Sequence, residues 1–327
     1  MSTPPKTFTE TTSFRALDNN SYETIHFPER LGNAANIAYG GFALAAAIRA
    51  ATLSVPATYF LYTIQGAYLG PALTDRPLHA TTHTIRQTRT FATRRIDIFQ
   101  TQDSDTQPRA CLTALADFQV DEPALLEYSV SPSKPYSGPQ GLGNTESNRQ
   151  QKVREGKISK EMADAHRKTF GVLDRFFDLR PCPEGIFYHN LTGMAKTLPT
   201  PQDGLPLTAK TSADWVRSLH ALPTYADQLS NLGFLMDGAL SFAPLAYSGM
   251  FLDDAGAVSS LDFSLRVFTR GVRMEEWGLK EVRVRVGREG RGFAEAWLFD
   301  GEGRAVACMS QQSIVRRGSG GKGVVRL

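Results

Sequence analysis

The first half of the chain contains one long apolar stretch followed by several alternating stretches. Residues 36–53 are rich in alanine and carry a single charge, Arg49, so they predict a helix that is buried on nearly all sides. Apolar and polar residues then alternate with a period of two, which is typical of strands in an antiparallel sheet with short connections. These strands are expected at 59–68, 78–87, 92–100 and 110–120, with a short first strand at 22–27 and a polar turn at 103–108.

The pattern changes between residues 121 and 168. Pro, Ser, Gly, Asn and Gln dominate residues 129–151, and charged residues dominate residues 152–168. This composition predicts a linker with a short exposed helix near 160–167 and high mobility near 133–148.

The second half repeats the order of the first half. Residues 232–246 are apolar on nearly every face and read as the start of a buried helix. Met236-Asp-Gly in this stretch takes the place that Tyr39-Gly-Gly has in the first half. Strands are expected at 172–179, 212–219, 260–268, 282–286, 291–299 and 305–315.

Each half therefore predicts one long helix wrapped by a curved antiparallel sheet, the α+β arrangement known as a hotdog, and the whole chain predicts a double hotdog. The expected parts are an N-terminal hotdog domain at 1–125, a polar linker at 126–168, a C-terminal hotdog domain at 169–317 and a flexible basic tail at 318–327. The candidate site described below lies in the C-terminal domain.

Asp237 is the only charged residue in the apolar stretch 232–246. An ionised carboxylate buried without a partner costs roughly several kcal/mol, so a specific role is needed to explain it. It can cap free N–H groups at the start of a helix, or it can act as a catalytic group. The pattern alone leaves both roles open.

Composition and charge restrict the class of protein. The chain has 327 residues, of which 41% are hydrophobic and 21% are charged, a balance typical of globular domains. The net charge of +3 and the scattered basic residues do not indicate a nucleic-acid partner. The three cysteines indicate a reducing compartment without disulfides or a zinc site, and Cys111 and Cys308 are expected to be buried thiols.

The expected location is cytoplasmic. The N-terminus has no apolar core of the signal-peptide type. Residues 50–74 carry no charge, but Pro56 and Pro71 interrupt them, so we expect no membrane span. The last three residues, Val325-Arg326-Leu327, faintly resemble a peroxisomal Ser-Lys-Leu signal, which would make the protein peroxisomal if it is read.

The chain resembles the type II acyl-CoA thioesterases, a family with two fused hotdog domains, including its fungal-type members. The resemblance covers most of both halves but not the linker, and it rests on the order and spacing of short motifs. The motifs are Tyr39-Gly-Gly, 62–71 and 89–95 in the first half, and 214–217, Met236-Asp-Gly, 259–263, 276–277, 291–293 and 306–316 in the second half.

The resemblance implies a catalytic Asp, Thr and Gln that together hold and activate one water molecule. The Asp falls on Asp237, and the Thr falls on Ser260, which departs from the family residue but keeps a hydroxyl. The Gln falls on Gln311, with Gln312 as the alternative register. Gly40 takes the place of the Asp in the first half, so one complete site per chain is expected. Taken singly, Ser260 reads as an ordinary strand serine and Gln311 as a solvated or backbone-bonded amide.

Hydrolysis of a thioester also needs hydrogen-bond donors for the carbonyl oxygen. Backbone N–H groups at a helix start can supply them. The candidate substrate-binding residues are therefore Tyr39, Gly40 and Gly41 from the first half and Gly238 from the second half. Arg291 is a candidate contact for the CoA phosphates, and a structural ion pair is the alternative role for it.

The implied reaction converts an acyl-CoA to a free carboxylic acid and CoA, with no cofactor beyond the CoA of the substrate. A homodimer or higher homo-oligomer formed through the sheets is expected. Because Ser replaces Thr, a non-catalytic protein that binds acyl-CoA or an acyl carrier stays an alternative on the same fold. A hydratase or dehydratase ranks below both, because the histidine nearest before Asp237 is His220.

Other catalytic constellations find little support. His79 and His83 share a strand face but have no cysteine or carboxylate beside them, so no metal site is expected. The chain has no Gly-x-Ser-x-Gly motif of the serine hydrolases. Phe242 and Tyr68 are aromatic candidates for limiting the acyl chain length.

Overall fold

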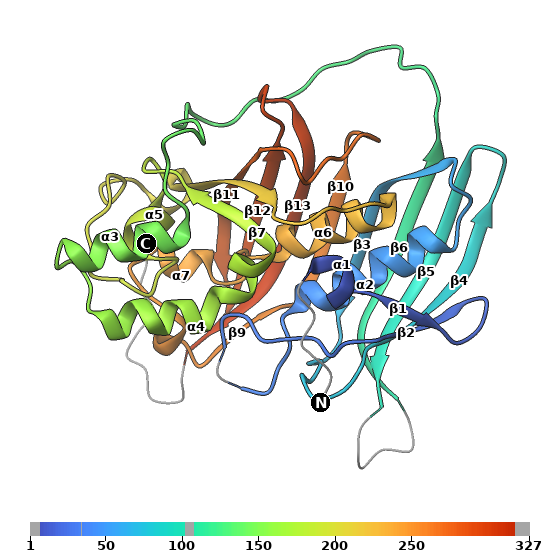
Figure 1. Ribbon diagram of the computed structural model, residues 1–327, viewed down its shortest axis with the longest axis horizontal. Helices are drawn as coiled ribbons and strands as arrows, with labels where there is room; N and C mark the ends of the chain where they lie inside the picture. Colours follow the sequence, from blue (N-terminus) through green and yellow to red (C-terminus); the bar gives the residue numbers. More distant parts are fainter. Residues whose placement is uncertain (1–6, 34, 102–107, 318–327) are drawn as a thin grey trace.

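The computed structural model describes residues 7–33, 35–101 and 108–317 (Figure 1). Most of the turn expected at 103–108 lies outside the described residues. The same holds for the tail at 318–327 with its Val325-Arg326-Leu327 signal.

The described residues form the following strands and helices. The strands are β1 (Phe14–Ala16), β2 (Ser21–Thr24), β3 (Tyr59–Tyr68), β4 (His79–Gln87), β5 (Phe91–Gln100), β6 (Arg109–Val120), β7 (Phe177–Pro181), β8 (Thr211–Ser218), β9 (Ala257–Ser260), β10 (Asp262–Val267), β11 (Gly278–Arg288), β12 (Arg291–Phe299) and β13 (Ala305–Arg316). The α-helices are α1 (Phe8–Thr11), α2 (Gly40–Leu53), α3 (Thr145–Arg154), α4 (Lys160–Phe176), α5 (Ile186–Asn190), α6 (Tyr225–Asp237) and α7 (Ala243–Tyr247), and short 3-10 helices lie at Leu207–Ala209 and Leu252–Asp254. Across the described residues, no helix is long and apolar enough to cross a membrane.

Within the described residues the strands form a single 13-stranded sheet. Its order is β1-β2-β4-β5-β6-β3-β10-β13-β12-β11-β8-β7, with β9 also paired to β13. The neighbouring strands are antiparallel. The two halves of the chain join where β3 pairs with β10, and Gly66 lies opposite Phe263 at this junction.

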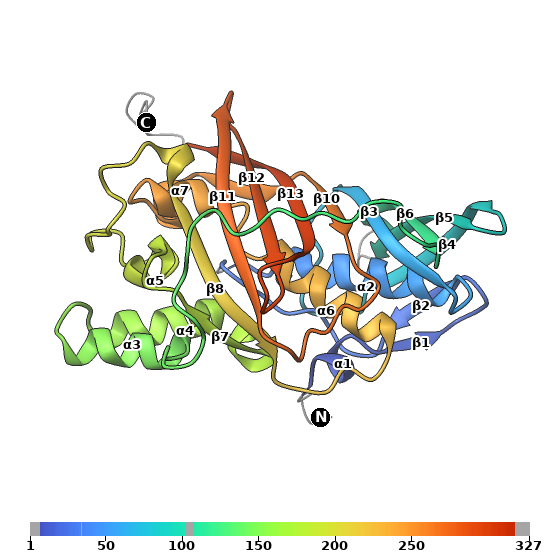
Figure 2. The same ribbon diagram turned by 90° about the horizontal axis from the view of Figure 1, so that it is seen from above.

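Helices α2 and α6 form the centre of the core. Both lie on the same side of the continuous sheet, as the two views show (Figures 1 and 2). The helices approach closely at Gly233 of α6, where an added Cβ would lie 2.2 Å from Ile48 Cδ1 of α2. Ile48 and its neighbour Leu44 are fully buried. A sheet around two buried helices is the arrangement that the sequence pattern predicts.

Helix α6 lies earlier in the chain than predicted. It begins after a capping box, in which the side chains of Thr224 and Asp227 each accept a hydrogen bond from the other's backbone N–H, and it ends at Asp237. The expectation that Asp237 lies near the start of its helix was therefore wrong, and so was the N-cap interpretation. The missed signal is the Thr224-x-x-Asp227 spacing, which marks a helix start in sequence.

The region expected to be a linker contains two helices. Helix α4 is longer than the short helix predicted near 160–167, and it continues through residues 172–176, where the sequence predicts a strand. Phe170, Leu173 and Phe176 recur at intervals of three residues, which places them on one face of a helix. Strand β7 begins only at Phe177, after this apolar face has packed on the core.

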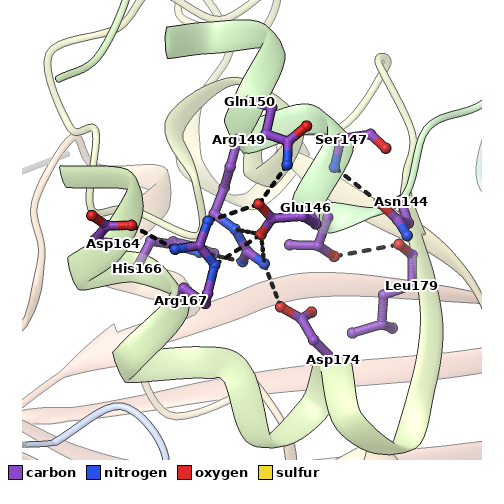
Figure 3. Close-up of polar contacts among 11 residues, drawn as sticks. Asn144, Glu146, Ser147, Arg149, Gln150, Asp164, His166, Arg167, Asp174 and Leu179 are labelled. Atoms are coloured by element: carbon purple, nitrogen blue, oxygen red, sulfur yellow. Dashed lines mark hydrogen bonds and ion pairs between the residues drawn. The ribbon is translucent and has the colours of Figure 1, made fainter. Parts of the chain in front are cut away.

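An ion-pair cluster joins α3 to α4 (Figure 3). Arg149, whose side chain is buried, donates to Glu146 at 2.8 Å and to Asp174 at 2.6 Å. It also donates to Nδ1 of His166 at 3.0 Å, and burial, followed by the nearby Arg149 charge, lowers the pKa of His166 to about 3. His166 therefore stays neutral and accepts the hydrogen bond, and the two helices are fastened to each other.

The segment expected to be mobile, 133–148, makes many specific contacts. The Ser133 N–H donates to Glu281 of β11 at 2.9 Å, and the Tyr136 hydroxyl donates to the same carboxylate at 3.2 Å. The Trp215 indole N–H donates to the Ser137 carbonyl at 2.8 Å. These contacts lie on the face of the sheet away from α2 and α6, so a polar composition did not prevent close packing here.

We expect Gly66→Ala to destabilise the protein. A Cβ at Gly66 would lie 2.1 Å from the Thr113 carbonyl oxygen and 2.9 Å from the Ala114 Cα, which are backbone atoms of the paired strand β6. Relieving such overlap typically costs about 1–3 kcal/mol. Thermal and urea unfolding should show this loss. Gly204→Ala is the control, because nothing lies within 4 Å of its added Cβ. Equal stability of both variants would contradict the close contact of Gly66 in β3 with the backbone of β6.

Candidate active site

The Asp237 carboxylate lies between the C-terminal end of α6 and the N-terminal end of α2. Asp237 is the last residue of α6, and Gly40 is the first residue of α2. A Cβ added to Gly40 would lie 3.1 Å from Asp237 Oδ2, and the Gly41 N–H donates a hydrogen bond to the carboxylate. The positive end of α2 therefore stabilises the Asp237 charge, whereas the negative end of α6 opposes it.

Two side chains donate to the same oxygen of Asp237. The Tyr68 hydroxyl at the end of β3 donates to Oδ1 at 2.9 Å, and Gln311 Nε2 of β13 donates to Oδ1 at 2.8 Å. The Asp237 side chain is only 5% exposed. Two donors on Oδ1 fix the plane of the carboxylate and leave Oδ2 turned toward Gly40.

Opposing effects act on the pKa of Asp237. Burial raises this pKa above its ordinary value of 3.8, and it is the largest single effect. The hydrogen bonds from Gln311 and Tyr68 and the charge of Lys280 act in the opposite direction. The carboxylate is thus a stronger base than an exposed aspartate, because its net pKa remains raised.

Gln311 carries an unused acceptor beside Asp237. A carboxylate can only accept, so the amide presents Nε2 to it and turns Oε1 elsewhere. Oε1 is buried and has no hydrogen-bond partner among the described residues. The alternative residue Gln312 is exposed and instead contacts Asp262, through its N–H at 2.8 Å and its amide at 3.3 Å. Of the two glutamines, the structure brings Gln311 to Asp237.

A β-bulge directs Ser260 toward the same face of the sheet as Gln311. Ser260 of β9 lies opposite Ser313 of β13, and Ser264 of β10 lies opposite Ser310 of β13. Between these two pairs the chain advances by four residues through β9 and β10 but by only three residues along β13. The extra residue changes which side chains point inward. Directly opposed residues share a face, and Ser313 shares its buried face with Gln311, two residues away. Ser260 is therefore a diagonal neighbour of Gln311, and it makes no hydrogen bond to Asp237 or Gln311 themselves.

Among the remaining predicted substrate-binding residues that the structure describes, Tyr39 and Gly238 already use their hydrogen-bond donors within the protein, whereas Gly40 does not. Tyr39 is buried beside the site, and its hydroxyl donates to the Phe234 carbonyl at 2.7 Å. The Gly238 N–H already donates to the Leu235 carbonyl at 3.2 Å as part of the helix end. The Gly40 N–H has no hydrogen-bond partner in the described part of the chain.

Arg291 lies apart from Asp237, at the start of β12. Its side chain is about half exposed and lies 3.5 Å from the Glu289 carboxylate. An ion pair, the alternative role considered for it, is therefore present. Its contact with CoA phosphates stays a prediction.

Sequence reasoning missed two functional groups around Asp237. Tyr68, considered only as a limit to the acyl chain, places its hydroxyl on the carboxylate. Lys280 is buried, and its Nζ donates to the carbonyls of Leu235 at 2.6 Å and Gly238 at 2.8 Å. A signal existed for Lys280, because it lies in phase with the buried Val282 in the alternating pattern of β11.

Other potential sites lie elsewhere or lack ligands. In the ranges that the structure describes, no group of three or more His, Cys, Asp or Glu residues could hold a metal ion. Cys111, Cys182 and Cys308 are all free and buried. A cavity of about 1240 Å³ lies on the opposite face of the sheet, lined in part by Tyr62 and Trp297, so it is separate from the Asp237 site.

The raised pKa of Asp237 predicts a pH-dependent effect on stability. A folded-state pKa above the unfolded value means that ionisation of Asp237 destabilises the fold, with no loss below about pH 3.8 and a growing loss as pH rises through the folded pKa. Asp237→Asn should therefore have a higher Tm than the wild type at pH 7–8, with a gain that shrinks toward pH 4. A variant that is less stable than the wild type at pH 8 but equal to it at pH 4 would refute this sign.

Comparison with solved structures shows the fold. An acyl-CoA thioesterase II from Mycobacterium marinum superposes with a TM-score of 0.66 at 20% identity, over 96% of this chain and 99% of that chain. The tesB protein of Mycobacterium avium subs paratuberculosis gives 0.65 at 17% identity, over 93% and 96%. A protein with a hot dog fold from Alicyclobacillus acidocaldarius gives 0.67 at 12% identity, over 95% and 98%. The double hotdog prediction is confirmed.

Comparison with sequence families gives the identity of the two halves. Residues 27–119 match the profile of the acyl-CoA thioesterase N-terminal domain, and residues 162–315 match that of the C-terminal domain. A search of curated proteins found no significant match. Because the two domain profiles together cover most of the chain in the order that the fold requires, the chain belongs to the acyl-CoA thioesterase family and is a thioesterase.

Proposed function

We propose that the protein hydrolyses acyl-CoA thioesters with a water molecule that is held and activated by Asp237, Gln311 and Ser260. The observation that carries this proposal is the orientation of Gln311. Its Nε2 is committed to Asp237, so its buried Oε1 remains as an acceptor next to the carboxylate. A buried acceptor without a partner costs about 1–3 kcal/mol, and a water molecule that donates to it would remove this penalty.

The water would have a defined orientation. One of its hydrogens would point to Gln311 Oε1 and the other to Asp237 Oδ2, the oxygen that receives no hydrogen bond from Tyr68 or Gln311. The Ser260 hydroxyl, on the same face of the sheet, can donate to or accept from this water. Holding the nucleophile in one position removes much of the entropic part of the barrier.

The proton transfer would fit the raised pKa of Asp237. As the water oxygen attacks the thioester carbonyl carbon, Asp237 takes the proton, and a C–O bond forms while the carbonyl becomes an oxyanion. A general base of this kind contributes roughly 10²–10⁴-fold to the rate. The Tyr68 and Gln311 hydrogen bonds lower the pKa of Asp237 and so favour the ionised carboxylate, against the effect of burial.

The oxyanion would be stabilised at the start of α2. The first N–H groups of a helix have no partner within the helix, and the helix dipole adds positive potential there. The Gly41 backbone acts on Asp237 and lowers its pKa, so we assign the oxyanion to the Gly40 N–H. The Gly238 N–H, an equal candidate in the sequence, serves the end of α6 instead.

The last step releases CoA. Collapse of the oxyanion re-forms the carbonyl and breaks the C–S bond, and the electron pair leaves with the sulfur. A thiol has a pKa of roughly 8.5, so the thiolate leaves without a strong acid, and the proton on Asp237 returns to it or to solvent. The products are a carboxylic acid and CoA, and the atoms balance with one water consumed.

Thiol release from a panel of acyl-CoAs tests this function. Asp237→Asn should lower kcat by roughly 10²–10⁴-fold because the base is lost, and Gln311→Ala should lower it because the water is less well held. Asp253→Asn and Gln312→Ala are matched controls on exposed side chains and should keep wild-type rates.

The outcomes separate the alternatives. Wild-type thiol release that survives Asp237→Asn would disprove the mechanism. Binding of acyl-CoA without any thiol release by the wild type would instead indicate the non-catalytic binding protein.

Ser260 can be tested with its own series. Ser260→Thr should retain most of the activity, because it restores the hydroxyl that the family resemblance implies, whereas Ser260→Ala should lose most of it. Ser259→Ala is the control, because Ser259 is exposed. Equal rates for all four proteins would show that the Ser260 hydroxyl has no part in holding the water.

A further inference from the structure

We propose that Lys280 is a positioning residue for thioester hydrolysis, which fastens the end of α6 and keeps the Asp237 carboxylate charged at the start of α2. This inference rests on the proposed function of Asp237. It concerns a residue whose side chain does not reach the reacting water but acts through the carboxylate.

The placement of Lys280 is unusual for a lysine. It lies on the inner face of β11, between the buried residues Gly278 and Val282, and only 5% of it is exposed. Lysine is almost never fully buried unless it is paired. Its position in the hydrophobic core therefore requires specific partners.

Two of these partners flank Asp237 along the chain. Lys280 Nζ donates to the carbonyls of Leu235 and Gly238, two residues before Asp237 and one residue after it. The last carbonyls of a helix lack partners within the helix. Lys280 adds a second donor to the Leu235 carbonyl, which also accepts from the Gly238 N–H, and it donates to the Gly238 carbonyl, so it holds the backbone on both sides of the Asp237 carboxylate.

The charge of Lys280 offsets an unfavourable helix end. A carboxylate at the C-terminus of a helix is repelled by the partial negative charge there, whereas a cation is attracted to it. The charge of Lys280 lowers the pKa of Asp237, against the effect of burial. Burial lowers the pKa of Lys280 itself to about 8, and Asp214 and Asp237 oppose this decrease.

Asp214 shares Lys280 with Asp237. It lies directly opposite Lys280 on β8, so the two side chains are on the same inner face of the sheet. Burial raises the pKa of Asp214 to about 6, and the Lys280 charge limits this rise. One cation therefore stands between two carboxylates, and a change at either Lys280 or Asp214 alters the charge balance at Asp237.

The titratable groups that face Asp237 and Lys280 come from several helices and strands. Asp237 faces Tyr39 before α2, Tyr68 of β3 and Lys280 of β11. Burial, then the Asp237 charge, raises the pKa of both tyrosines well above the ordinary value, so they stay neutral across the working range. Asp214 in turn faces Cys182 and Tyr247, whose pKa values burial raises, so both stay neutral. Lys280 and, through it, Asp214 are thus the groups that can move the ionisation of Asp237.

The pH dependence of kcat/KM tests the proposal, because two substitutions should move the acidic limb in opposite directions. Lys280→Met removes the cation, raises the pKa of Asp237 and should move the limb to higher pH, with a loss on the acidic side of the limb on the order of tenfold. Above about pH 6, where Asp214 is ionised, Asp214→Asn removes an anion that competes for Lys280 and should lower the pKa of Asp237, which moves the limb to lower pH. Lys168→Met, an exposed lysine on α4, should leave the limb unchanged.

The results distinguish this proposal from the proposed function. If Asp237→Asn keeps the acidic limb, the role of Asp237 as the base fails, whatever Lys280 does. If Asp237→Asn removes the activity but Lys280→Met and Asp214→Asn lower kcat without moving the limb, only the role of Lys280 is overturned. Thermal unfolding of each variant identifies any that do not fold, and Asp214→Asn keeps the test decisive if Lys280→Met is one of them.

Discussion

The burial of the Asp237 carboxylate between two helix ends is the constraint on which the site depends. Burial in the core favours its neutral form, and the end of its own helix α6 adds negative potential. The start of α2, with the Gly41 N–H, compensates from the other side. The rest of the site can be understood as the set of groups that keep this carboxylate charged and oriented without exposing it to bulk water.

The two halves of the chain contribute different parts of one site. The second half supplies Asp237 and Gln311, and the first half supplies the start of α2 and the Tyr68 hydroxyl. The sequence repeat matched Asp237 to Gly40, but this match was wrong, because Asp237 ends α6 whereas Gly40 begins α2. Gly40 instead lies against the Asp237 carboxylate. Any side chain there would meet Oδ2 and the Tyr68 ring at 3.1 Å. The absence of a side chain at Gly40 is thus what leaves room for the Asp237 carboxylate.

The periodic patterns predicted the fold well, because strand alternation and buried helices follow directly from which face is apolar. They located α2 and most strands, whereas they misplaced α6, whose start depends on the short capping signal at Thr224. Residues 129–151 also appeared too polar to pack, yet their hydroxyl and amide groups find partners such as Glu281 on the outer face.

The candidate site was predictable only in part, for a physical reason. Gln311 and Asp237 could be named from the resemblance, but their contact joins residues 74 positions apart. Tyr68 and Lys280 reach Asp237 from strands whose register no local pattern determines. The bulge that directs Ser260 inward is a difference of one residue between two strands, and it becomes visible only when both strands are paired.

The central claim is that Asp237 activates water rather than attacking the thioester itself. A single turnover in H₂¹⁸O with enzyme in excess over acyl-CoA tests this most directly. Attack by water places one ¹⁸O in the carboxylic acid formed in that turnover and none in the protein. Unlabelled acid, with ¹⁸O found in the peptide that contains Asp237, would show a covalent acyl-enzyme and contradict the account.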